Sequence, residues 1–207
     1  MKKLAIFMSV CFLFMFFQIN SVWADTKNIS ITEDFDGQVI LQNLDSPWGM
    51  IWGPEGKLWI TERSGKRVIE VDPVKGDKRT LITIDEVIFD KQHQGLLGLA
   101  LDPDFGQSDL LYVNYTYMVK GQPMHKIARL KYDRTSKTLT MQDTIIDGLP
   151  AGDDHQGGRL IFGPAGNLYF SKGELGHNQG ANRCKLNESQ RLPTAQEVEV
   201  KDWSAYV

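Results

Sequence analysis

The chain has few cysteines and no surplus of positive charge, and each shortage excludes a class of protein. Cys11 and Cys184 are its two cysteines, and the formal net charge is −3. Cys11 lies in an apolar leader, so Cys184 is left without an internal disulfide partner once that leader is removed. A nucleic-acid partner needs a basic face that neutralises phosphates, and this charge balance does not support one.

The N-terminus carries the parts of a secretory signal. Lys2 and Lys3 form a short basic region, residues 4–17 are almost wholly apolar, and Ala24 ends a cleavage site of small residues. The apolar run of 14 residues is shorter than the roughly 20 residues that span a bilayer, so a membrane anchor is the weaker interpretation. We predict a signal peptide over 1–24, a mature chain over 25–207 without a membrane span, and a secreted or periplasmic location.

The mature chain lacks long helical periodicity and lacks the motifs of several cofactors. No stretch repeats its apolar residues with the 3.6-residue period of a long amphipathic helix. There is no Gly-x-Gly-x-x-Gly and no phosphate loop, so nicotinamide and nucleotide cofactors find no support. Asp90, Lys91 and His93 lie close in sequence, but no histidine–carboxylate spacing fits a known ligand set, so no metal ligands are predicted.

What the chain does contain is a repeated hairpin. An apolar run, a turn at Pro54, Pro103 or Pro164, and a second strand-like run occur three times. Proline fixes one turn torsion and glycine permits a positive one, so Gly-Pro-x-Gly suits a tight hairpin. Further strand-like runs lie between the hairpins, at 67–71, 80–84, 126–132 and 138–141.

These runs predict an all-β fold with about four strands per unit. Units of roughly 40–60 residues match the blades of a β-propeller, and a β-sandwich with chance similarity between turns is the alternative. About three units are present, whereas propellers close with about four to eight blades. We therefore expect the N-terminal part of a propeller, with about three four-stranded blades, unless such units close by oligomerising. Aromatic residues at repeat positions are predicted to pack between blades: Trp48, Trp52, Trp59 and Tyr169.

Residues 154–159, Asp-His-Gln-Gly-Gly-Arg, lead directly into the third hairpin. An imidazole beside a carboxylate suits general-base chemistry, because the unperturbed pKa of imidazole lies near neutrality. The alternative is a polar loop in which His155 only hydrogen-bonds to backbone. Arg159 is interpreted as a structural ion-pair partner of Asp153 or Asp154, with a site residue as the alternative, and His125 as an ordinary loop histidine.

Five motifs follow one another along the chain: Leu-Asp-Ser-Pro-Trp-Gly-Met at 44–50, Trp-Ile-Thr-Glu-Arg at 59–63, Gly-Leu-Leu-Gly-Leu-Ala-Leu-Asp-Pro-Asp-Phe at 95–105, Asp-His-Gln-Gly-Gly-Arg at 154–159 and Gly-Glu-Leu-Gly-His-Asn-Gln at 173–179. In this order they resemble the soluble quinoprotein glucose dehydrogenases and aldose sugar dehydrogenases, the glucose/sorbosone dehydrogenase family. The likeness runs from about residue 39 to the last residue and corresponds to roughly the first half of a family member.

The resemblance implies an incomplete portion of a six-bladed propeller that binds pyrroloquinoline quinone (PQQ) and calcium near its axis. It implies oxidation of an aldose sugar at C1 to the lactone. His155 matches the family's catalytic base, which also borders the cofactor, and Asp154 and Gln179 match residues that contact the sugar. Most cofactor ligands of the family lie in later blades, so the alternative is a propeller fragment without catalysis.

One departure from the family affects the substrate site. The family usually has a glutamine two residues before Gly95, where this chain has His93 flanked by Gln92 and Gln94. His93 and Gln94 are therefore both candidates for binding the sugar. The resemblance also leaves open a homodimer, as in full-length relatives.

Overall fold

The computed structural model describes residues 37–173 together with residues 175, 196 and 199. The predicted signal peptide at 1–24 and the predicted substrate residue Gln179 lie outside the described residues. The chain divides into the units 1–38 and 39–207, and the strands all belong to the second unit. Across the described part of the chain, no helix is both long enough and apolar enough to cross a membrane.

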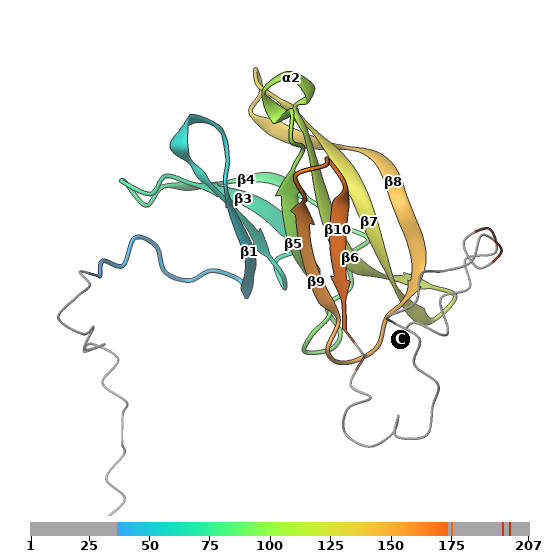
Figure 1. Ribbon diagram of the computed structural model, residues 1–207. Helices are drawn as coiled ribbons and strands as arrows, with labels where there is room; N and C mark the ends of the chain where they lie inside the picture. Colours follow the sequence, from blue (N-terminus) through green and yellow to red (C-terminus); the bar gives the residue numbers. More distant parts are fainter. Residues whose placement is uncertain (1–36, 174, 176–195, 197–198, 200–207) are drawn as a thin grey trace, which may run out of the picture. The chain divides into compact units, whose positions relative to one another are not determined.

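The strands form three antiparallel sheets, coloured along the chain in Figure 1. The first sheet consists, in order, of β1 (Pro47–Trp52), β2 (Leu58–Glu62), β3 (Arg67–Val71) and β4 (Lys78–Thr83). The second consists of β5 (Leu96–Leu101), β6 (Leu110–Val119), β7 (Gln122–Asp133) and β8 (Thr138–Pro150). The third pairs β9 (Gly157–Phe162) with β10 (Leu168–Lys172), and the short helices are η1 (Pro54–Gly56) and α2 (Phe105–Ser108).

This arrangement confirms the all-β prediction and its blade-like units. Each four-stranded sheet is a meander in which every strand pairs with its sequence neighbour, as in a propeller blade. The three proline-containing hairpins connect β1 to β2, β5 to β6 and β9 to β10. The third unit has two described strands rather than the four predicted, and the three described sheets do not close into a ring.

The first strand of each sheet carries the same irregularity. The register shifts after Pro47, Leu96 and Gly157, so that three steps along the first strand lie opposite two steps along its partner. Such a β-bulge leaves an extra residue outside the ladder and turns the strand. The bulges therefore release backbone groups at equivalent places in β1, β5 and β9.

Polar side chains from the preceding sheet use these released groups. The Thr61 hydroxyl on β2 donates to the carbonyl of Leu97 in β5. The Asn114 amide on β6 donates to the carbonyl of Gly158 in β9, at 2.7 Å. Both donors are buried, and their equivalent positions show that each sheet is attached to the next by the same kind of contact.

The main apolar core lies between the first and second sheets. Trp59 is completely buried and meets Phe105 and Tyr132 edge-on, with ring centroids 5.8 and 4.9 Å away. Its indole N–H donates to Glu70 at 3.1 Å, so the polar end of the ring is also satisfied. Trp59 thus packs between two blades, as the repeat predicted.

The other aromatic repeat positions differ from the prediction. Trp48, Trp52 and Tyr169 are 46%, 64% and 57% exposed. They lie on strands of the first and last sheets, and in this structure no described sheet covers them. Packing between blades therefore holds for Trp59 alone among the four.

Candidate active site at the start of β5 and β9

Two loops from different sheets meet where β5 and β9 begin. Residues 89–95 lead into β5, and residues 151–156 lead into β9. Lys91 Nζ lies 3.7 Å from Asp153 Oδ2, and the Gln94 amide donates to the carbonyl of Gly152 at 3.0 Å. These contacts hold together residues that are far apart in sequence.

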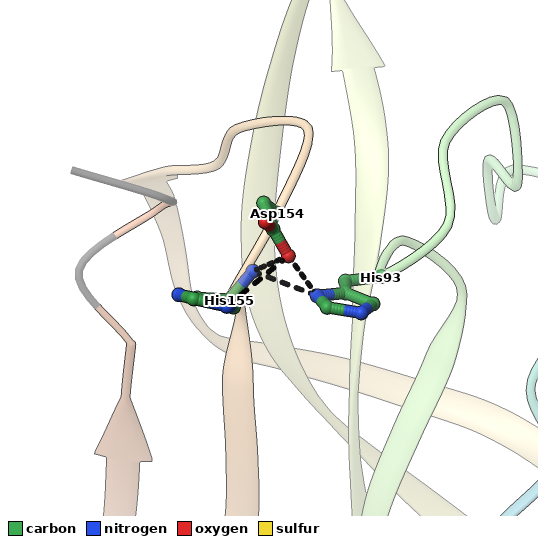
Figure 2. Close-up of side chains that lie close together, drawn as sticks. All are labelled: His93, Asp154 and His155. Carbon is green, nitrogen blue, oxygen red and sulfur yellow. Dashed lines mark hydrogen bonds and ion pairs between the residues drawn. The ribbon is translucent and has the colours of Figure 1, made fainter. Parts of the chain in front are cut away.

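His93, Asp154 and His155 bring three polar side chains together at this junction (Figure 2). His93 Nδ1 contacts Asp154 Oδ1, and His155 Nε2 lies 3.5 Å from the same oxygen. The two imidazole rings are stacked, with centroids 5.5 Å apart and 17° between their planes. The three side chains are each about one-third exposed, so a small molecule can reach them.

The backbone of His155 has an unusual conformation that aims its amide into the cluster. Its φ is 41°, in the left-handed region that side chains other than glycine seldom adopt. Its N–H donates to His93 Nδ1 at 3.0 Å and to Asp154 Oδ1 at 2.8 Å. Such a conformation costs about 1–3 kcal/mol and persists only where surrounding contacts impose it.

Gly173 is one of the residues that permit this conformation. A Cβ added at Gly173 would overlap the carbonyl oxygen of His155. The amide of Gly173 also donates to the carbonyl of Gln156 at 3.1 Å. The end of β10 can therefore pass close behind the loop only because position 173 has no side chain.

Gln156 holds the loop through buried hydrogen bonds, a role that the sequence did not indicate. It is 2% exposed, and its amide donates to the carbonyls of Gly152 and Asp154, at 2.6 and 2.9 Å. Its side-chain oxygen also accepts the N–H of Gly152 at 3.4 Å. Buried loop backbone needs such partners, so an amide inside an irregular, glycine-rich motif is the signal that could have found it.

The structure distinguishes His93 from Gln94, the two candidates to take the place of the family glutamine. His93 faces the cluster, whereas Gln94 is 2% exposed. The Gln94 side chain donates to Gly152 and accepts the N–H of Asp90. The Gln94 amide is thus buried and bonded to backbone, whereas the side chain of His93 is one-third exposed. That either residue contacts the sugar stays a prediction.

Arg159 also differs from its prediction. It lies on β9, where it is exposed, and its N–H donates to Ser171 Oγ at 3.0 Å. The carboxylates expected to pair with it have other partners: Asp153 pairs with Lys91, and Asp154 with His93. The predicted ion pair between Arg159 and these carboxylates is therefore wrong.

His125 is not a loop histidine but lies within β7, completely buried. Burial first, and then the positive charge of Lys172, hold the pKa of His125 well below its ordinary value of 6.5. His125 Nε2 lies 2.9 Å from Asn114 Oδ1, and the Asn114 amide donates to Gly158. Because an amide oxygen only accepts, His125 Nε2 is the donor, and this buried chain supports the start of β9 just after His155.

The meandering sheets, each attached to the next through its first strand, define a β-propeller protein. Its candidate site is the polar cluster where β5 and β9 begin. The Glucose / Sorbosone dehydrogenase family matches residues 44–192, and the chain belongs to this family. This confirms that the five motifs resemble those of the glucose/sorbosone dehydrogenase family.

Individual relatives agree with this assignment. The chain is 36% identical over 183 residues to quinoprotein glucose dehydrogenase B of Acinetobacter calcoaceticus, covering 85% of this chain and 38% of the relative. Its fold matches the PQQ-bound aldose sugar dehydrogenase of Streptomyces coelicolor with a TM-score of 0.61 and 33% identity, over 67% of this chain and 41% of that one. The apo-form of the soluble aldose sugar dehydrogenase of Escherichia coli matches with a TM-score of 0.60 and 26% identity, over 72% and 43%. The chain spans less than half the length of each of these relatives.

Proposed function

We propose that this chain carries the acid–base residues of a PQQ-dependent sugar dehydrogenase that oxidises an aldose at C1 to the lactone. The observation that carries the proposal is the partly exposed cluster of His93, Asp154 and His155 in a member of this family. His155 is the proposed general base. The substrate partner is an aldose sugar, which Asp154 and His93 would contact.

The geometry of the cluster supports a proton transfer to His155. The C1 hydroxyl of the aldose would give its proton to Nε2, and Asp154 Oδ1, 3.5 Å away, would stabilise the imidazolium that forms. Nδ1 of His93 faces Asp154, so Nε2 of His93 would make a hydrogen bond to another sugar hydroxyl. General-base assistance of this kind contributes typically 10²–10⁴-fold in rate. When bound, a quinone would supply the two-electron oxidation at C1, and the residues of this chain would assist it by taking up the proton of the C1 hydroxyl.

One described residue is proposed to border the quinone. The imidazole of His155 is one-third exposed and can meet a flat cofactor, so His155 is also the proposed cofactor contact. The grouped donors among the described residues are two imidazoles and one carboxylate, whereas calcium takes about six to eight oxygen ligands. This cluster by itself is therefore not a calcium site, and a calcium ion of the proposed enzyme would need oxygen ligands from elsewhere in the protein.

The test is dye reduction by the purified chain with PQQ, calcium and an aldose. We expect sugar-dependent activity that falls by at least about 10²-fold in His155→Ala, because the base is lost. Asp153→Asn removes an exposed carboxylate next to the cluster and serves as the matched control that keeps activity. Absence of activity in the wild-type chain at saturating PQQ, or full activity in His155→Ala, would contradict the proposal.

A second candidate function is a propeller module that acts without catalysis. The exposed apolar side chains of Trp52, Ile161 and Tyr169 favour it, because such groups on open sheet faces are typical of association surfaces. PQQ titrated into the chain would then leave its absorption spectrum unchanged. Tight PQQ binding would contradict this candidate.

We also propose that the protein is exported and that residues 1–24 are removed. The basic, apolar and small-residue parts of the N-terminus support this. Mass spectrometry of protein recovered from outside the cytoplasm should find Asp25 as the first residue. Recovery of the chain with residues 1–24 still attached would contradict it.

A further inference from the structure

We propose that His93, Asp154 and His155 form a binding site for a divalent transition-metal ion such as Zn²⁺. The sequence predicted no metal ligands, because His93 and the Asp154-His155 pair belong to separate segments of the chain. The fold brings them together, and one donor atom from each lies within 4.8 Å of the other two. Figure 2 shows the three side chains converging from the two loops.

One of the donor distances already matches a zinc site, and a second would have to lengthen. Zinc binds imidazole nitrogen at about 2.0–2.1 Å and carboxylate oxygen at about 2.0–2.2 Å, which places tetrahedral donors about 3.4 Å apart. His155 Nε2 and Asp154 Oδ1 already have that spacing, at 3.5 Å. His93 Nδ1 touches Asp154 Oδ1 and would move outward as the ion enters, which its one-third exposed side chain allows.

An ion between these atoms would replace a contact that is already present. His93 Nδ1 contacts Asp154 Oδ1 directly, and an ion bound by both atoms would take the place of that contact. The N–H of His155 points at both atoms. A carboxylate oxygen has a second lone pair, so Asp154 can keep this hydrogen bond and bind an ion, whereas His93 exchanges the hydrogen bond for the metal.

The donor set selects the type of metal. Two imidazole nitrogens and one carboxylate oxygen suit Zn²⁺ and its first-row neighbours, whereas calcium and magnesium prefer oxygen ligands. Three protein ligands leave a coordination position for water or for a substrate oxygen. His93 is decisive, because the glutamine usual at this position in the family offers no imidazole nitrogen.

One functional consequence rests on the proposed function. An ion bound to His155 Nε2 occupies the lone pair that would accept the sugar proton, so the metal would inhibit sugar oxidation. Metal binding itself does not depend on that reaction, and it is measured without quinone or sugar.

The experiment uses the chain without the predicted signal peptide, residues 25–207, after removal of metal with a chelator. A Cys184→Ser background ensures that no thiolate contributes. Co²⁺ is added and its visible d–d absorption recorded, and Zn²⁺ is then titrated as a competitor. We expect a cobalt spectrum of low coordination number, displaced by Zn²⁺. His93→Gln and Asp154→Asn should each weaken Co²⁺ binding by at least about tenfold, since each removes a ligand. Asp153→Asn, the neighbouring exposed carboxylate, should leave binding unchanged.

Absence of a cobalt spectrum in the Cys184→Ser chain would overturn the proposal. The proposal would also be overturned if His93→Gln bound Co²⁺ as tightly as the Cys184→Ser chain. An equal loss of binding in Asp153→Asn and Asp154→Asn would likewise overturn it, because it would show only general attraction by acidic groups. Circular dichroism checks that each variant is folded. Because two ligand variants are made independently, the test still gives a result if one of them does not fold. Metal binding without dehydrogenase activity would separate this site from the proposed function, because each has its own readout.

Discussion

The backbone of His155 lies in the left-handed region, and Gly173 and Gln156 hold it there. Sequence showed that an imidazole follows a carboxylate, but it could not show this conformation, because the contacts that impose it come from β10 and from a buried amide. The same holds for His93, whose partner Asp154 is on another loop. The type of chemistry could be predicted from residues 154–155, whereas the third member of the cluster required the fold.

Gly173→Ala tests the support of His155. The new Cβ would overlap the His155 carbonyl, so we expect a loss of about 2 kcal/mol or more in the free energy of unfolding, because backbone must shift. Gly106→Ala in α2 is the control: its Cβ would meet open space, and alanine in a helix should be neutral or stabilising by up to about 1 kcal/mol. Urea denaturation measures both, and equal effects in the two variants would argue against the proposed close contact.

The buried His125 predicts a pH dependence of stability. Its pKa is depressed in the folded chain, so below about pH 6.5 the unfolded state binds a proton that the folded state does not, and stability falls as the pH falls. The stability that neutral His125 contributes is fully present above about pH 6.5. Below that pH, the free energy of unfolding falls by about 1.4 kcal/mol per pH unit. The charge that faces His125 is that of Lys172 on β10.

Urea denaturation at about pH 7.5 and about pH 5.5 measures this loss. His125→Gln keeps a donor for Asn114 but cannot take up a proton, so its stability should change less between the two conditions. His93→Gln removes a partly exposed imidazole and serves as the comparison. The same pH dependence in His125→Gln and the wild type would contradict the explanation.

At the scale of elements, local sequence determined the hairpins and most strands. Proline and glycine define the turns, and alternation defines β3 over the predicted range 67–71. β8 extends well past the predicted run at 138–141, because its second part has no buried residue and no clear alternation, so that pairing with β7 determines its length. α2 has four residues, which is too short for a helical period to be visible. The bulges and the contacts between sheets are tertiary features that alternation does not record.

Asn114→Ala tests the contact between the second sheet and β9. The substitution leaves the Gly158 carbonyl and the His125 N–H buried without their partner, so we expect a loss of about 2–3 kcal/mol. Ser171→Ala is the matched control, because Ser171 holds the equivalent place on β10 but is exposed, and it should cost no more than about 0.5 kcal/mol. Chemical denaturation compares them, and a small effect of Asn114→Ala would show that the sheets are held by apolar packing alone.

At the scale of the whole molecule, the apolar side chains fall into two groups that the sequence could not separate. Trp59 and Trp52 occur in the same hairpin, yet one is completely buried and the other is 64% exposed. The difference depends on whether a neighbouring sheet covers the strand, which is a property of the assembled blades and not of the repeat. The prediction that aromatic repeat positions pack between blades therefore succeeded only where two sheets meet.

Substitutions at these positions should separate stability from association. Trp52→Gln together with Tyr169→Gln should lower self-association, measured by static light scattering, because the exposed apolar area shrinks. Each change should alter the free energy of unfolding by no more than about 0.5 kcal/mol, since little packing is lost. Trp59→Ala is the opposite case: it empties the core beside Phe105 and Tyr132 and should cost about 3–5 kcal/mol. If the double variant loses as much stability as Trp59→Ala, the exposed side chains are covered in solution, and the open sheet faces are buried against another molecule.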